Sequence, residues 1–174
     1  MNSMLRKLFA RLTPEPRPGA PLFKAAAAEA RRKHWYREGA VEDNVDGRFA
    51  MLATVLALIT VRLEDGGAEA RAHSGWLAER FVEAMDAEHR EMGVSDPTLG
   101  KTVRRLVSAL SNRNDIWREA VAGTADWRDA AARSVYRGTP PDEAVLDHCA
   151  ARLRILWEAL KASADQALIG GKIG

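Results

Sequence analysis

The sequence has almost no cysteine and no apolar stretch long enough to cross a membrane. Its 174 residues include one cysteine, Cys149, which excludes an internal disulfide framework and suits a reducing compartment. We expect this cysteine to be an ordinary buried apolar residue. The most apolar run covers residues 49–61, whereas a membrane-spanning helix needs about 20 apolar residues. The run is therefore predicted to be a buried core helix.

Catalytic and metal-binding motifs are missing as well. A carboxylate-bridged metal site in a helical bundle needs two Glu-x-x-His pairs, and the chain offers one comparable pair, Asp86 with His89. His148 and Cys149 lie next to each other, but no Cys-x-x-Cys accompanies them,. There is no phosphate-binding loop or dinucleotide fingerprint. The sequence predicts no enzyme, no metal site and no cofactor.

What the chain does contain is helical patterning from end to end. Hydrophobic residues make up 47% and charged residues 29%, as in a soluble globular protein. Apolar residues recur at helical spacing and no strand hairpin pattern is present. Helices are expected over residues 22–37, 48–63, 69–91, from Pro97 to about 122, 127–137, and along the seam Leu146–Ala164. The poor helix formers at 111–114 are expected to bend or break one of them. The prediction is an all-α fold of about six to seven helices.

Three segments are expected along the chain. Residues 1–21 form a basic amphipathic arm with a linker, in which four prolines within residues 13–21 forbid regular helix,. Residues 22–168 form one helical domain, and the glycine-rich residues 169–174 form a disordered tail. Residues 1–37 carry nine basic and two acidic side chains, a net charge of +7, so the remainder carries −5. Such a basic arm is attracted to anionic surfaces.

The first twelve residues are amphipathic. Their apolar face consists of Leu5, Leu8, Phe9 and Leu12, with Arg6, Lys7 and Arg11 off that face. One interpretation is a short helix lying in an anionic membrane surface. A frayed terminus, a helix docked on its own domain and a mitochondrial transit peptide are the alternatives.

Basic groups elsewhere leave nucleic acid as a second class of partner. Arg31-Arg32-Lys33 and the group Lys101, Arg104 and Arg105 are candidates for phosphate contacts,. Nothing in the sequence indicates specific DNA recognition. The alternative function is thus an RNA- or ribosome-associated helical binding module without catalytic activity.

Several motifs in this order resemble the ubiquinol–cytochrome c chaperone family. The matching elements are His34-Trp35-Tyr36, Asp46-Gly47-Arg48-Phe49, and the stretch from Met85-Asp86 through Arg90-Glu91-Met92-Gly93-Val94-Ser95-Asp96. The sequence departs from the family's pattern at Val55, where a histidine is frequent, and at Ala50, where an acidic residue is frequent. No role of those two family residues can be transferred to this chain.

The resemblance implies a non-enzymatic assembly chaperone for the cytochrome bc1 complex, which binds newly made cytochrome b at the membrane surface. Mitochondrial members work with a small partner protein near the ribosome, so both are implied as partners. The short chain and its Ala- and Arg-rich composition suggest a bacterial member. The expected location is the bacterial cytoplasm, peripheral at the inner membrane, or the matrix side if the source is eukaryotic.

The motif residues receive structural roles. We expect Asp46 to cap the central helix, Phe49 to anchor it, and Arg48 to pair with Asp86 or Glu91 or else to face water. Gly93 and Asp96 are suited to ending one helix and starting the next. The turn 92–101 is also the expected client surface, through Met92, Val94 and Lys101, although closing the turn would explain its residues equally well.

Overall fold

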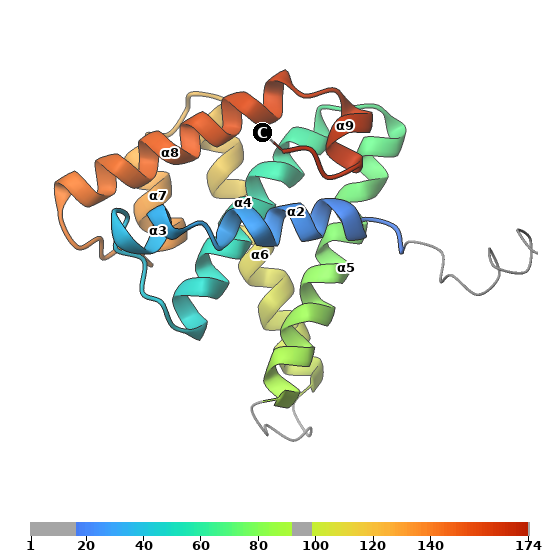
Figure 1. Ribbon diagram of the computed structural model, residues 1–174, viewed down its shortest axis with the longest axis horizontal. Helices are drawn as coiled ribbons and strands as arrows, with labels where there is room; N and C mark the ends of the chain where they lie inside the picture. Colours follow the sequence, from blue (N-terminus) through green and yellow to red (C-terminus); the bar gives the residue numbers. More distant parts are fainter. Residues whose placement is uncertain (1–16, 92–98, 174) are drawn as a thin grey trace, which may run out of the picture.

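The computed structural model describes residues 17–91 and 99–173, and every regular element in these ranges is a helix (Figure 1). The helices are α2 (Ala20–Ala30), α3 (Lys33–Arg37), α4 (Val45–Glu64), α5 (Ala68–Glu91), α6 (Leu99–Val121), α7 (Trp127–Val135), α8 (Glu143–Ala162) and α9 (Asp165–Ile169). The predicted all-α fold class is confirmed. None of these helices is long and apolar enough to cross a membrane.

Helix α4 lies at the centre of the fold. It contacts α2, α5, α6, α7 and α8, and its residues from Ala50 to Val61 are buried except for Leu52, which is half-buried. A helix that is apolar on all sides is stable only when other helices surround it. The predicted buried core helix is therefore confirmed.

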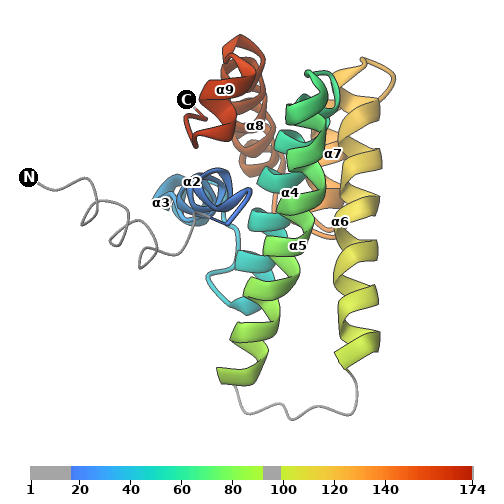
Figure 2. The same ribbon diagram turned by 90° about the vertical axis from the view of Figure 1, so that its right-hand side faces the viewer.

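The other helices cover α4 from different sides. Helices α2 and α3 lie on the face that points to the viewer in Figure 1, and α8 and α9 cross the top. Helices α5 and α6 form a long neighbouring pair that extends below the rest of the body (Figure 2). The base of the molecule is therefore built from fewer helices than its centre.

Three features of the helices differ from the prediction. Helix α2 begins at Ala20, so residues 20–21 belong to it and not to the predicted linker, because proline is tolerated in the first turn of a helix,. The expected helix over residues 22–37 is broken between Ala30 and Lys33, because α3 turns back on the end of α2. The Trp35 Nε1–H donates to the Glu29 carbonyl at 3.0 Å, and the Tyr36 hydroxyl donates to the Ala30 carbonyl at 2.8 Å. The poor helix formers at 111–114 do not break α6, which is continuous there, so of the expected bend or break the break is wrong.

The tail is folded rather than disordered as far as residue 173. The Lys172 N–H donates to the Ala167 carbonyl at 2.9 Å, and Ile173 is only 8% exposed within the core. Burial of this isoleucine gives the last residues a hydrophobic reason to stay in place. The predicted disordered tail is therefore wrong over residues 169–173.

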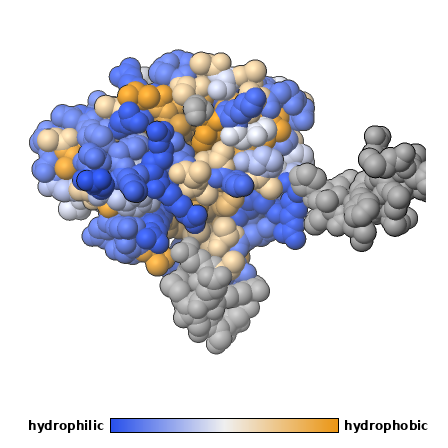
Figure 3. Space-filling model, in the orientation of Figure 1, coloured by the Kyte–Doolittle hydropathy of each residue, from blue (hydrophilic) through white to orange (hydrophobic). Residues whose placement is uncertain are grey.

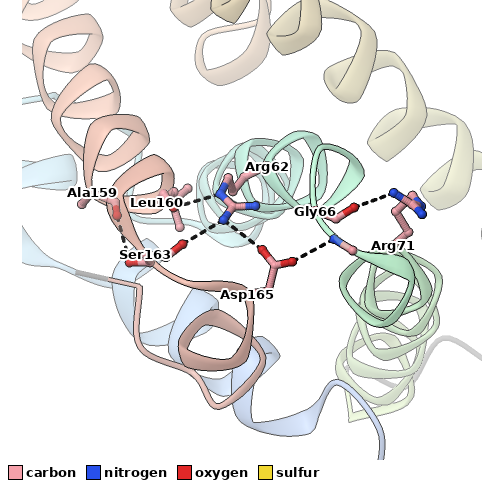
Figure 4. A network of polar contacts seen from close by, with 8 residues as sticks. Arg62, Gly66, Arg71, Ala159, Leu160, Ser163 and Asp165 are labelled. Carbon is pink, nitrogen blue, oxygen red and sulfur yellow. Dashed lines mark hydrogen bonds and ion pairs between the residues drawn. The ribbon is translucent and has the colours of Figure 1, made fainter.

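A polar network at the end of α4 holds this C-terminal part (Figure 4). Arg62 donates to the carbonyls of Leu160 and Ser163 at 3.1 and 2.8 Å and to the Asp165 carboxylate at 3.0 Å. Asp165 also accepts the Gly67 N–H at 2.8 Å, and this bond, followed by the bond from Arg62, holds the pKa of Asp165 below its usual value. Because the last carbonyls of a helix lack helical partners, Arg62 both ends α8 and fixes α9. We call this network the Arg62–Asp165 latch.

Candidate client groove

A groove of about 720 Å³ lies at the opposite end of α4 from the latch, where α4 begins. It is bounded by the first turn of α4, one residue of α5, the middle of α6 and the end of α7. Its lining residues are Val45, Asp46, Phe49, Met85, Arg105, Leu106, Ala109, Asn112, Arg113, Ile116, Arg133, Arg137 and Gly138. We call this feature the client groove.

The floor of the groove is apolar and continuous with the core. Phe49 packs against Phe81 with ring centroids 5.4 Å apart, and Leu106 and Ile116 are each 3% exposed. At the mouth, Val45 leaves 43% of its surface in water. The apolar surface that the groove leaves to solvent therefore comes from Val45 and the half-buried Phe49. Apolar surface with a polar rim is typical of a binding surface.

The rim carries mainly positive charge. Arg105, Arg133 and Arg137 are exposed around the opening. Asp46 is the single carboxylate among the described lining residues, and it pairs with Arg137 at 3.2 Å. The groove therefore presents an apolar floor beneath a net positive rim.

Arg113 connects the floor to the rim. It is 8% exposed, its guanidinium lies 5.6 Å from the centre of the Phe49 ring, and it donates to the carbonyls of Ser134 and Ala109 at 3.1 and 3.0 Å. Burial, with a smaller contribution from the nearby Arg137, lowers the pKa of Arg113 to about 10. The side chain therefore stays charged near neutral pH and fastens α6 to the end of α7.

A buried polar cluster supports this arrangement from behind. The Ser134 hydroxyl shares a hydrogen bond with the Thr54 hydroxyl at 2.6 Å and accepts the Trp117 Nε1–H at 3.1 Å. Thr54, Trp117 and Ser134 come from α4, α6 and α7, and all three are fully buried. Satisfied buried polar groups fix the relative positions of their helices, so the groove walls are held in a defined geometry.

The structure corrects the expected role of Asp46. Helix α4 begins at Val45, and its cap is Asn44, whose side-chain oxygen accepts the Gly47 N–H at 2.8 Å. Asp46 lies within the first turn of the helix, too far along to cap it, and instead forms the ion pair with Arg137 at the groove rim. Asp43, Asn44 and Asp46 are all residue types that cap helices,, and the side-chain geometry selects Asn44.

The neighbouring motif residues shape the same corner. A Cβ atom on Gly47 would lie 1.9 Å from the Glu42 carbonyl oxygen, so only glycine fits this close approach. Arg48 donates to Asp43 at 2.7 Å, and its predicted pairing with Asp86 or Glu91 stays a prediction. Phe49, half-buried, packs on the core as expected and also lines the groove.

The predicted client surface lies mostly outside the described residues. Met92, Gly93, Val94 and Asp96 fall there, as does the whole membrane arm, Leu5, Arg6, Lys7, Leu8, Phe9, Arg11 and Leu12. Lys101 is exposed on α6 but is not among the groove's lining residues. Asp86 is half-buried on α5, and the backbones of Arg90 and Glu91 end that helix.

Sequence reasoning missed Arg113 and Ile116. A signal for Arg113 was present, because Leu106, Leu110, Arg113 and Trp117 continue one buried stripe at steps of four, three and four,. The fold also brings His34 to His148, with ring centroids 5.8 Å apart. Among the described residues, however, no group of three or more metal-ligating side chains comes together.

Comparisons with known proteins identify the family. Residues 37–173 match the family model described as "Ubiquinol-cytochrome C chaperone". The chain belongs to the ubiquinol–cytochrome c chaperone family. The family resemblance drawn from the motifs is thereby confirmed, as is the role of an assembly chaperone for the cytochrome bc1 complex. The alternative of an RNA- or ribosome-associated module is not favoured.

A solved structure supports the fold independently. The crystal structure of the Cbp3 homolog from Brucella abortus superposes with a TM-score of 0.73, covering 97% of this chain and 94% of that chain at 23% sequence identity. At this identity the likeness concerns the fold. The search of curated proteins found no match for the chain.

Proposed function

We propose that this chaperone acts by binding, without chemistry of its own, and that the client groove holds an apolar segment of newly made cytochrome b. The observation that carries the proposal is a groove between α4 and α6 with a largely buried apolar floor, from which Val45 and Phe49 remain partly open to solvent. Its volume of about 720 Å³ lies within the range of pockets that enclose a ligand, ~300–1,000 Å³. A groove of this size accommodates a few large side chains, such as those along one face of a helix.

The energetics suit reversible binding. Each client side chain that becomes fully buried against the floor contributes about 1.5–3 kcal/mol before ordering costs. Ordering the client segment and its side chains offsets much of this gain. Two or three such side chains would hold an unassembled subunit and still release it when its natural partners compete.

The rim gives the groove a preference among apolar segments. Arg105, Arg133 and Arg137 surround the opening, and one of them is paired with Asp46. Charge complementarity mainly increases the association rate and suppresses wrong partners. We therefore expect a client segment whose apolar face is flanked by acidic side chains or by a carboxylate terminus.

The proposed location of the chaperone follows from the nature of its client. Cytochrome b enters a membrane, so we propose that the chaperone works at the inner membrane surface, with residues 1–12 as a reversible anchor and the residues from 13 to the start of α2 as the tether. Basic residues near an anionic leaflet contribute about 1 kcal/mol each. The test is flotation of the chain on anionic vesicles, against a variant carrying Leu5→Ser, Leu8→Ser and Phe9→Ser. Equal flotation would show that the arm is not the anchor.

A bulky side chain introduced into the groove tests whether the client binds there. Ala109 lines the groove at half exposure, so Ala109→Trp places an indole where the client would sit. The matched control is Ala151→Trp at an exposed position of α8. Affinity capture from detergent-solubilised membranes, with cytochrome b detected by its haem spectrum, measures binding.

Ala109→Trp should weaken capture by about tenfold or more, the equivalent of one lost buried side chain. Ala151→Trp should capture as the unmodified chain does. Equal capture by both variants would overturn the groove proposal.

The turn 92–101 remains a proposed second contact. Val94→Ser with Lys101→Ser should weaken capture without loss of helical circular dichroism. Loss of helicity would make the turn a folding element instead. The same captured material, probed for ribosomal proteins and for a small partner protein, shows whether either accompanies the chaperone.

A further inference from the structure

Helices α2 and α3 carry a second charged surface that neither the groove nor the arm includes. Lys24, Arg31, Lys33 and Arg37 are all exposed on these two helices, and we call these four residues the basic face. Figure 3 shows strongly hydrophilic residues gathered over α3 and the adjoining end of α2, beside paler apolar residues along α2. A single-sign patch of this kind attracts polyanions.

The charge of the basic face is not neutralised within the described part of the chain. Glu29 is the only acidic residue between positions 20 and 37, and it pairs with Arg32 at 3.1 Å. None of the four residues of the basic face forms an ion pair with another described residue. Their positive charges are therefore available to an external partner.

The fold also fixes the geometry of these charges. The bonds from Trp35 and Tyr36 to the carbonyls of Glu29 and Ala30 hold α3 against the end of α2. Arg31, Lys33 and Arg37 then surround a hollow of about 390 Å³, which Tyr36, Asp43 and Arg48 complete. Arg48 already pairs with Asp43, so the net charge of the hollow comes from the other three cations. Its size suits a compact anionic group such as a phosphate.

We propose that the basic face docks the folded domain on anionic lipid headgroups, with a phosphate seated in this hollow. Helices α2 and α3 lie on one face of the body (Figures 1 and 2), and the chain that precedes α2 joins that face at the N-terminal end of α2. The proposed arm and the basic face would therefore meet one membrane together. The proposal rests on the chaperone's work at a membrane, and not on the client groove.

Vesicle flotation without cytochrome b tests it in the full chain. The variant is Lys33→Glu with Arg37→Glu, and the control is Arg104→Glu with Arg154→Glu, which changes the net charge equally at exposed positions of α6 and α8. Vesicles of phosphatidylcholine alone are compared with vesicles of equal parts phosphatidylcholine and phosphatidylglycerol. Losing the attraction of one basic residue, about 1 kcal/mol, corresponds to ~fivefold, and each glutamate adds repulsion. The Lys33/Arg37 variant should therefore lose at least about 30-fold in partitioning onto anionic vesicles.

The control variant should lose far less, and neither chain should bind phosphatidylcholine alone. Equal losses in the two variants, or no loss in the Lys33/Arg37 variant, would overturn the proposal. The two variants are also compared for RNA binding in a filter-retention assay. If the Lys33/Arg37 variant loses RNA binding while its vesicle binding is unchanged, the proposal is overturned, since the face would then recognise nucleic acid. If the charge reversals reduce helical circular dichroism, Lys33→Gln with Arg37→Gln repeats the test without introducing repulsion.

A second background separates the basic face from the arm. In the full chain with Arg6→Gln, Lys7→Gln and Arg11→Gln, the Lys33/Arg37 substitutions should still reduce partitioning by a similar factor. Disappearance of the effect in that background would show that the face does not act independently. Because cytochrome b is absent from the assay, failure here leaves the groove proposal unaffected, and failure of groove capture leaves this one unaffected.

Discussion

A largely buried arginine lies at each end of α4, and the two arginines have different partners. Arg62 has a carboxylate partner, Asp165, together with two helix-end carbonyls. Arg113 donates to two carbonyls and lies over the Phe49 ring, and it forms no ion pair with a carboxylate among the described residues. One end is thus neutralised and closed, whereas the other keeps a positive charge beside an open apolar groove.

The two ends are therefore expected to have different roles, the latch in stability and the groove end in binding. A paired arginine that also caps a helix is fully used within the fold, so the latch is expected to stabilise the chain and do nothing more. A buried cation without a carboxylate is costly to the fold, and its lowered pKa reports that cost. We infer that the groove end keeps this cost because its charge serves the client.

The largest expected effect comes from breaking the latch. Arg62→Ala removes three hydrogen bonds and leaves the carbonyls of Leu160 and Ser163 without their donor. The free energy of unfolding should fall by about 3 kcal/mol, as measured by urea denaturation. Capture of cytochrome b at a temperature where the variant is folded should be unchanged. A loss of capture there would contradict the separation of roles.

Arg113→Met should lower the free energy of unfolding less than Arg62→Ala does, but should weaken the capture of cytochrome b more. Methionine keeps an aliphatic side chain over Phe49, while the Ser134 and Ala109 carbonyls lose a donor, so unfolding should cost about 1–3 kcal/mol less than in the unmodified chain. Capture should also weaken, because the charge at the groove floor is gone. Arg113→Lys restores the charge and should recover capture in part. No recovery would mean that Arg113 acts through packing alone.

These two arginines also show where sequence reasoning succeeds and where it stops. The long helices α4, α5, α6 and α8 follow from apolar periodicity, which depends on neighbours three and four residues away. The short helix α9 depends on Arg62 and Gly67, which bind Asp165 from about a hundred residues away. No local pattern indicates such a contact, so the sequence predicts no separate helix at 165–169 and a disordered tail from residue 169 onward.

The groove could not be predicted from the sequence, for the same reason. The family motif pointed correctly to Phe49 as an anchor, but the groove needs the end of α7 and the middle of α6 beside it. The break between α2 and α3 also lacked a signal, since no proline or glycine stands between Ala30 and Lys33. It depends on where the Trp35 and Tyr36 side chains find acceptors.

A smaller effect distinguishes the two capping candidates at the groove end of α4. Asn44→Ala removes the bond to the Gly47 N–H and should lower the free energy of unfolding by about 1 kcal/mol. Asp46→Ala removes only an ion pair between side chains that are 62% and 70% exposed, which should cost about 0.5 kcal/mol or less. A larger loss for Asp46→Ala, measured by thermal unfolding, would restore Asp46 as the cap.

A further effect is expected only at acid pH, as a pH dependence of stability at α3. Burial, with help from Arg152 and Arg32, lowers the pKa of His34 from 6.5 to about 4. The unfolded chain therefore takes up a proton that the folded chain refuses, so stability falls as pH drops from about 6.5 to 4. His34→Phe should remove that part of the decline, measured as urea midpoints across this pH range. An unchanged pH profile in the variant would show that His34 titrates normally.

The most direct test of the groove is the accessibility of a single thiol in the presence of the client. The native thiol of Cys149 is fully buried and burial raises its pKa to about 11, so it should react little. Ala109→Cys places a reactive thiol in the groove, and Ala162→Cys places one at the exposed end of α8 beside the latch. Bound cytochrome b should slow maleimide labelling at position 109 and leave position 162 unchanged. Unchanged labelling at 109, or protection at 162 instead, would contradict the account.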